Sequence, residues 1–192
     1  MNKTRLEAFS DAVIAIIMTI MVLELKVPHS ADIGALKPLL PVFLAYVLSF
    51  VYLGIYWNNH HHMLQATRKV NGKVLWANMH LLFWLSLIPF VTGWMGENHF
   101  EAVPMAIYGV VLLCCAIAYT ILQVAIVKHD TNENDLLATA IGSDLKGKAS
   151  IVCYIAAIPL AFVSPWISGG LYVLVAMIWL VPDRRIEKAF NK

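Results

Sequence analysis

Charged side chains are scarce in this sequence, which excludes an ordinary soluble domain. Asp, Glu, Lys and Arg make up 14% of the 192 residues, whereas 60% of the residues are hydrophobic. A typical soluble domain has about 25% charged and about 45–50% apolar residues. The composition therefore predicts an integral membrane protein. The formal net charge of +2 is too small to indicate nucleic acid as a partner.

Cysteine is also rare, and its placement argues against two kinds of site. Cys114, Cys115 and Cys153 all lie inside apolar runs, and no Cys-x-x-Cys spacing occurs. We interpret them as small buried hydrophobes rather than as disulfides or metal ligands. Long polar connections are missing as well, so we expect one domain over residues 1–192.

Long uncharged runs define the expected membrane spans, because a lipid-facing helix needs about 20 apolar residues. The last run, residues 149–182, is long for one helix and tight for two. Pro165 and the pair Gly169 and Gly170 near its middle favour a turn between two short helices. We predict an all-α integral membrane protein with six transmembrane helices per chain, at roughly residues 5–26, 38–62, 74–96, 102–127, 149–165 and 167–183.

Positive charges predict the orientation of these spans. With six spans, 12 of the 14 Lys and Arg residues lie on one side, and only Lys26 and Lys37 lie opposite. Lys and Arg accumulate on the cytoplasmic side of membrane proteins. We therefore expect a multi-pass protein of the cell membrane with both termini in the cytoplasm.

The opening stretch, RLEAFSDAVIAIIMTIMVLEL (residues 5–25), is unusual for a lipid-facing helix. Only 12 uncharged residues, Ala12 to Leu23, lie between Asp11 and Glu24. This run is too short to cross the hydrocarbon core on its own.

Polar residues from three spans are expected at the same depth, near the cytoplasmic edge. Ser10 and Asp11 begin the first helix, the run NNHHH (residues 58–62) ends the second, and Asn78 and His80 lie about two turns into the third. A carboxylate inside the membrane boundary is costly unless it is paired. Possible partners of Asp11 are Arg5, Asn59, His60, His61, Asn78 and His80.

Three interpretations of this cluster remain open. The residues can fasten the first helix to the second and third. Alternatively, His60, His61, His62 and His80 can ligate haem or a metal ion in a membrane redox protein. The His and Asp side chains can also pass protons, as in transporters. The histidines gather at one edge only, and no charged residue lies near the middle of any span, which favours the first interpretation.

The first three spans carry a recognisable signature. R-L-E-A-F-S-D (residues 5–11), followed by A-V-I-A-I and V-L-E-L-K-V-P, resembles the opening helix of the transmembrane protein 175 family of endosomal and lysosomal potassium channels and their bacterial relatives. The similarity continues in Y-W-x-N-H-H (residues 56–61), W-A-N-x-H-L-L (residues 76–82) and P-F-x-T (residues 89–92). The last three spans match mainly in number, length and hydropathy.

The resemblance implies a channel selective for potassium over sodium, with the first helix of each chain lining the pore. Eukaryotic members resemble two six-span units fused and working as dimers, whereas this chain has one unit, so a homotetramer in the lipid bilayer is implied. This position explains the short uncharged run of the opening helix, because a helix that lines a water-filled pore need not present a full apolar length to lipid. We also predict a polar network for structure or gating, made of Arg5, Phe9, Ser10, Asp11, Trp57, Asn59, His60, His61, Asn78 and His80.

The family places the pore-facing stripe near Ile16, Thr19, Ile20 and Leu23, although the helix is apolar nearly all round and periodicity alone cannot choose this face. Rings of Ile or Leu would form an apolar constriction that forces ions to shed water, and a Thr19 ring would partly replace that water. T-G-W-M-G (residues 92–96) looks like a carbonyl filter but has no pore helix before it, so we regard it as unrelated.

Glu24 lies at the outer end of the same helix. Four copies would concentrate cations at the pore mouth. Pairing with Lys26 or simple solvation is an equally good explanation of this residue. No nucleophile with an adjacent base is evident, so we expect no enzyme activity, no cofactor and no metal site.

Overall fold

The protein is all-helical in the part of the chain that the structure, a computed structural model, describes: residues 2–67, 70–130 and 144–180. The elements are α1 (Lys3–Leu23), the short 3₁₀ helix η1 (Ile33–Leu39), α2 (Leu40–Ala66), α3 (Gly72–Ser86), α4 (Ile88–Glu97), α5 (Ala102–Asp130), α7 (Leu145–Leu160) and α8 (Pro165–Leu180).

Four helical segments are long and apolar enough to cross a membrane, which fits an all-α membrane protein. The first of them is the opening helix, so the expectation that it is too short to cross is wrong, because the helix begins at Lys3, well before the uncharged run. The four segments are Lys3–Leu23, Ile33–Gln65, Gly72–Glu97 and Ala102–Lys128, and α8 is a shorter apolar helix of 16 residues. α7 is also 16 residues long. Five of the six apolar stretches of the sequence thus contain one α-helix each, and the third contains the two helices α3 and α4.

Polar caps explain where several helices begin. The side chains of Asn2, Asn71 and Asp144 accept hydrogen bonds from backbone N–H groups in the first turns of α1, α3 and α7. These N–H groups have no partner within a helix, and Asn and Asp are among the side chains that satisfy them best. The caps therefore fix the starts of three helices near their charged flanking segments.

The third apolar stretch, expected as one span over residues 74–96, is broken at Leu87 into α3 and α4. Pro89 has no N–H, so it cannot continue the regular hydrogen-bond pattern of the helix. The Leu87 N–H instead bonds to the carbonyl of Trp84, three residues back, at 3.2 Å. The break lets α4 leave the direction of α3.

The turn between α7 and α8 differs in its position from the sequence-based expectation. It covers residues 161–164, and α8 starts at Pro165. Gly169 and Gly170 lie inside α8 rather than in the turn. A proline is well suited to the first turn of a helix, which explains why Pro165 alone is sufficient here.

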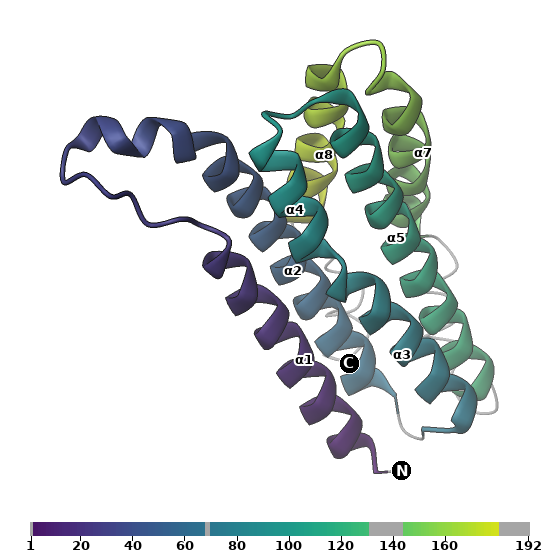
Figure 1. Cartoon of the computed structure of the whole chain (residues 1–192). Helices are drawn as coiled ribbons and strands as arrows, with labels where there is room; N and C mark the ends of the chain where they lie inside the picture. Colours follow the sequence, from purple (N-terminus) through teal and green to yellow (C-terminus); the bar gives the residue numbers. More distant parts are fainter. Residues whose placement is uncertain (1, 68–69, 131–143, 181–192) are drawn as a thin grey trace.

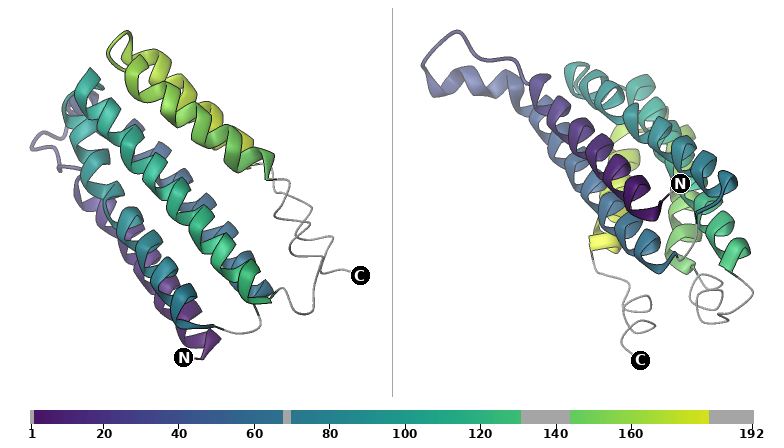
Figure 2. Two further views of the ribbon diagram at one scale, coloured as in Figure 1. Left: turned by 90° about the vertical axis from the view of Figure 1, so that its right-hand side faces the viewer. Right: turned by 90° about the horizontal axis from the view of Figure 1, so that it is seen from below.

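The helices form a bundle with α1 at one edge. Figures 1 and 2 show α1 lying along α2 and α3, with α7 and α8 on the far side of α5. The connection through η1 projects sideways from the bundle before α2 begins. α1 therefore packs with one face only, against α2, α3 and α4.

Hydroxyl groups in the core of the bundle are hydrogen-bonded. The Thr92 and Ser49 hydroxyls lie 2.7 Å apart, and the Ser49 and Tyr108 hydroxyls lie 2.9 Å apart. Tyr52 donates to the carbonyl of Tyr172 at 2.6 Å. Buried polar groups are costly unless they are paired in this way. These bonds join α2 to α4, α5 and α8.

Gly96 allows a very close helix approach in the outer half of the bundle. A Cβ atom at this position would lie 2.6 Å from the Cα atom of Val42 in α2. We expect Gly96→Ala to lower the free energy of unfolding by about 1–3 kcal/mol, because α4 would have to move away from α2. Thermal unfolding of the purified protein in detergent measures this as a lower Tm.

Gly170→Ala is the matched control. Nothing lies within 4 Å of a Cβ atom at Gly170, and Ala is favoured over Gly inside a helix. This variant should unfold at the wild-type temperature or above it. Equal Tm values for Gly96→Ala and Gly170→Ala would contradict the close contact.

Candidate functional site

α1 has one packed face and one uncovered face within the protomer. Its buried residues are Leu6, Ser10, Ile14, Ile17 and Met21. On the other face Ile16 is 56% exposed, Ile20 42% and Leu23 79%, and Thr19 is exposed as well. These are the four residues that the resemblance assigns to the pore, and their spacing of i, i+3, i+4 and i+7 places them on one stripe.

Thr19 is the polar group within this stripe. Its hydroxyl donates to the carbonyl of Ile16 in the same helix at 2.9 Å. Because the proton is directed to the backbone, the lone pairs of the hydroxyl oxygen are free to accept a hydrogen bond or contact a cation. The uncovered face is thus apolar with one ring of acceptor oxygens if several copies face each other.

A groove runs beside the stripe, between α1 and the junction of α3 and α4. It has a volume of about 460 Å³, and its lining includes Ile16, Ile20, Glu24, Ser86 and Phe90. Phe90 is 66% exposed. The groove therefore extends the uncovered surface of α1 onto α4.

Glu24 caps the C-terminal end of α1 and is exposed. Lys26, one of its possible partners, instead donates a hydrogen bond to Glu97 at 2.6 Å. The hydrogen bond to Glu97 raises the pKa of the Lys26 amine above its ordinary value. The Glu24 carboxylate is consequently not bound to the nearest lysine in the sequence.

Three buried side chains form one continuous hydrogen-bond chain between α1, α2 and α3. Asn78 Nδ2 donates to Ser10 Oγ at 3.0 Å, and Ser10 donates to the carbonyl of Leu6 at 2.8 Å. The Asn78 carbonyl oxygen lies 2.7 Å from His60 Nε2 and must accept, which places a proton on that nitrogen. Among the described residues, His60 Nδ1 is the buried side-chain atom left without a partner.

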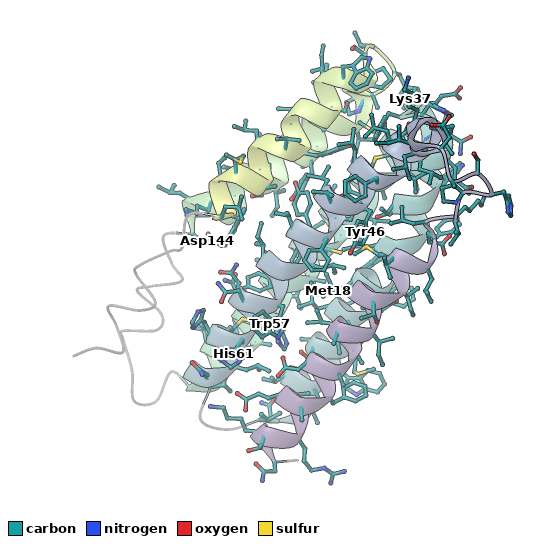
Figure 3. All side chains as sticks on the ribbon, turned by 90° about the vertical axis from the view of Figure 1, so that its left-hand side faces the viewer. Met18, Lys37, Tyr46, Trp57, His61 and Asp144 are labelled. Carbon is teal, nitrogen blue, oxygen red and sulfur yellow. The ribbon has the colours of Figure 1, made fainter. Side chains whose placement is uncertain are left out.

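A second contact joins α1 and α2 closer to the surface. Trp57 Nε1 donates to Asp11 Oδ1 at 3.1 Å. The Trp57 ring stacks on His61 with centroids 6.0 Å apart, and His61 Nε2 lies 2.8 Å from Gln65 Nε2. Figure 3 shows Trp57 and His61 on the part of α2 that lies beside the first half of α1. The donor to Asp11 is thus Trp57, which is not among the partners expected from the sequence.

The remaining members of the predicted network lie apart from these two groups. Asn59 donates to the carbonyl of Ile55 in its own helix at 2.8 Å, and His80 accepts from Trp84 Nε1 at 2.9 Å. Arg5 is exposed, and Phe9 is 46% exposed on the uncovered face of α1. Sequence reasoning missed the Trp84 contact, although the i, i+4 spacing of His80 and Trp84 predicts neighbours on a helix.

Metal ligation finds no support in the geometry of the described segments. No group of three or more His, Cys, Asp or Glu side chains within them is placed to hold a metal ion. The side chains of His60, His61 and His80 bond to Asn78, Gln65 and Trp84 instead.

The filter-like sequence T-G-W-M-G, residues 92–96, lies inside α4. Carbonyl groups in a helix point along its axis and bond to N–H groups four residues on, so they cannot form the ring of carbonyls that a filter needs. Thr92 is buried; its hydroxyl donates to the carbonyl of Ile88 at 2.6 Å and lies 2.7 Å from Ser49 Oγ. Its role is to hold α4 against α2.

The sequence is similar to those of known potassium channels. Residues 5–89 match a family described as "Endosomal/lysosomal potassium channel TMEM175". The chain is 56% identical over 192 residues to a potassium channel of Chryseobacterium sp., covering 100% of both chains. It is 31% identical over 190 residues to a potassium channel of Chamaesiphon minutus, covering 90% of this chain and 91% of that one.

A solved structure is similar over nearly the whole length. It is described as a crystal structure of a lysosomal potassium-selective channel TMEM175 homolog from Chamaesiphon minutus. The match has a TM-score of 0.81 and 27% sequence identity, and it covers 93% of this chain and 96% of that chain.

Proposed function

The chain belongs to the TMEM175 family, and from this premise we propose that it is a channel that conducts potassium in preference to sodium. Its relatives of similar length are named potassium channels, and the family is one of ion channels rather than enzymes. The observation that carries the proposal is the uncovered stripe of Ile16, Thr19, Ile20 and Leu23 on α1. The Thr19 hydroxyl within this stripe and the exposed Glu24 carboxylate at its end fit a face that meets water.

The proposed assembly is a homotetramer in which four copies of α1 surround the axis. α1 lies at the edge of the protomer and packs with one face only, so its other face is available to further copies. The groove beside Ile20 and Phe90 offers an adjoining surface for the α1 helix of a neighbouring copy. Four-fold closure would place Ile16, Thr19, Ile20 and Leu23 around the pore.

Selectivity would come from dehydration at apolar rings. Rings of Ile16, Ile20 or Leu23 narrow the pore and offer no ligand to an ion, so an ion must lose water to pass. The smaller sodium ion holds its water more strongly than potassium, so it meets the higher barrier. The Thr19 oxygens would partly replace the lost water, and Glu24 would raise the cation concentration at the outer mouth.

The two polar groups at the inner half of α1 would hold the pore helix in register. The chain of Ser10, Asn78 and His60 ties α1 to α2 and α3, and the bond between Asp11 and Trp57 adds a second tie to α2. We assign a structural role to these residues. Arg5 and Phe9 would lie on the pore side of α1 near its inner end.

The proposed location is the cell membrane, with both chain ends in the cytoplasm. The distribution of Lys and Arg supports this orientation. Lys3 donates to the carbonyl of Gln65 at 2.7 Å, which places the first residues of α1 beside the last turn of α2. Ser10, Asp11, Trp57 and His60 would then lie at the cytoplasmic edge.

Ion flux into liposomes that contain the purified protein tests the proposal. With equal gradients, potassium should enter faster than sodium, and protein-free liposomes should show neither flux. The oligomer should have the mass of four chains by light scattering with the detergent subtracted. Absence of flux, together with a visible absorbance band or bound metal, would favour the histidine-ligated redox protein instead.

A further inference from the structure

A small cavity lies away from α1, between α2, α5, α7 and α8. Its volume is about 40 Å³, whereas one water molecule needs about 10–15 Å³. It therefore has room for two or three waters or for one compact organic group. Nothing in the proposed conduction pathway uses it.

Aromatic rings form much of its wall. Tyr52 and Tyr56 come from α2, and Tyr119, Tyr154 and Trp179 come from α5, α7 and α8. The rings of Tyr56 and Tyr119 meet edge to face at 6.1 Å between centroids. Aromatic rings grouped in this way attract ammonium groups through their negative faces.

The wall already holds one ammonium group on its rim. Lys146 Nζ lies 5.9 Å from the centroid of the Trp179 ring and donates to the carbonyl of Ile178 at 3.1 Å. Trp179 Nε1 donates to Ser150 Oγ at 2.9 Å, which fixes the indole in place. The Trp179 ring thus already attracts a cation, and its own hydrogen bond holds it in place.

Asp144 supplies a carboxylate to the cavity, which it lines. It caps α7, since its Oδ1 accepts from the Gly147 N–H at 2.9 Å. The carboxylate occupies the space where a side chain at residue 147 would project, so Gly147 is what permits its position. Figure 3 shows Asp144 at the start of α7, at the end of the bundle away from η1. The cavity therefore combines an aromatic wall with one anion.

The Tyr56 hydroxyl is a further polar group on the cavity wall. Tyr56 lines the cavity, and within the described residues its hydroxyl makes no hydrogen bond. Its neighbour Tyr52, in contrast, donates to a backbone carbonyl at 2.6 Å. Tyr56 is only partly buried, and its oxygen is not among the fully buried unpaired atoms. The Tyr56 oxygen is therefore accessible and can accept from an N–H group placed in the cavity.

We propose that this cavity binds one small organic ammonium ion, with Asp144 as its counter-ion and Tyr56, Tyr119, Tyr154 and Trp179 as its aromatic surround. The ammonium can come from a soluble amine or from the ethanolamine headgroup of a membrane lipid, since both present the same group. The proposal does not depend on the channel function, because its residues lie outside α1 and binding is measured without flux.

Calorimetric titration with ethylammonium chloride tests the site on purified protein in phospholipid-free detergent. Asp144→Asn keeps the helix cap, because Asn caps as well as Asp, but removes the charge. We expect saturable binding to the wild type and an affinity about tenfold lower in Asp144→Asn. Tyr119→Leu should weaken binding too. The control Glu97→Gln removes one carboxylate near η1 and should leave binding unchanged.

Absence of saturable binding to the wild type would overturn the proposal, and so would equal affinities of the wild type and Asp144→Asn. Displacement by equimolar potassium chloride would also overturn it. Mass spectrometry of protein from bilayers with and without ethanolamine lipid then separates the two sources. One ethanolamine lipid per chain, lost in Asp144→Asn, identifies the lipid, and ethylammonium binding without retained lipid identifies a soluble amine.

Discussion

Liposomes that contain the Ile20→Asn variant should pass ions faster than wild-type liposomes and should discriminate less between potassium and sodium. Ile20 lies on the uncovered stripe of α1 and is 42% exposed in the protomer. In the proposed tetramer, four amides in place of four butyl side chains would let water enter the constriction and supply oxygen ligands. A barrier lowered by about 1.4 kcal/mol raises flux about tenfold. Ile16→Asn should act in the same direction.

The same substitution elsewhere separates a pore effect from general damage. Ile121 in α5 is 45% exposed and lies outside α1. Ile121→Asn introduces the same amide side chain at a similarly exposed position. Because this position lies outside α1, the ratio of potassium to sodium flux should stay unchanged. Wild-type flux and selectivity in both α1 variants, measured on correctly inserted protein, would place the pore somewhere other than this stripe.

Asn78→Leu should destabilise the protein strongly, by about 3 kcal/mol in the free energy of unfolding. The substitution leaves His60 Nε2 and Ser10 Oγ without their present partner inside the bundle. Each buried polar group that loses its partner costs about 1–3 kcal/mol. Thermal unfolding in detergent should show a much lower Tm, and α1 should separate from α2 and α3 first.

Two further variants make this prediction specific. Asn58→Leu makes the same substitution at an exposed position of α2, two residues before His60. It should leave the Tm nearly unchanged. Combining Asn78→Leu with His60→Phe removes both buried partners and should recover part of the loss, because an unpaired group is more costly than an absent one. A wild-type Tm for Asn78→Leu would show that the hydrogen-bond chain contributes little.

The sequence alone predicts the class of fold well, because uncharged runs report directly on membrane crossing. Its errors lie where backbone chemistry competes with hydropathy. Pro89 breaks the third stretch at Leu87, although the apolar run continues unchanged. Pro165 is enough to start α8, so Gly169 and Gly170 are free to lie inside the helix.

Which face of α1 stays uncovered is beyond prediction from the residues themselves for a simple physical reason. Ile14 and Ile17 are buried and Ile16 and Ile20 are exposed, yet all four have the same side chain. Only the packing of α2, α3 and α4 against one side of α1 distinguishes them. The resemblance to a family selects a face that periodicity could not, and that face is uncovered in the protomer, while its role in a pore stays a prediction.

The polar cluster illustrates the same limit. Four histidines lie near one end of the bundle, and composition treats them alike. The structure gives each a different environment, since His60 is buried against Asn78 and His61 stacks on Trp57. Spacing within one helix predicts neighbours such as His80 and Trp84, whereas partners on different helices depend on how those helices cross.

The hydrogen bonds from α1 to neighbouring helices lie in its first half only, within the described structure. Ser10 and Asp11 make them in the first half, whereas in the described structure residues 12–23 contact other helices through apolar side chains such as Ile14, Ile17 and Met21. Sliding or tilting of residues 12–23 therefore breaks no hydrogen bond between helices, and the next polar tie lies beyond α1, between Lys26 and Glu97. In the proposed tetramer, the spacing of the α1 copies at Ile20 would therefore depend on van der Waals contact alone.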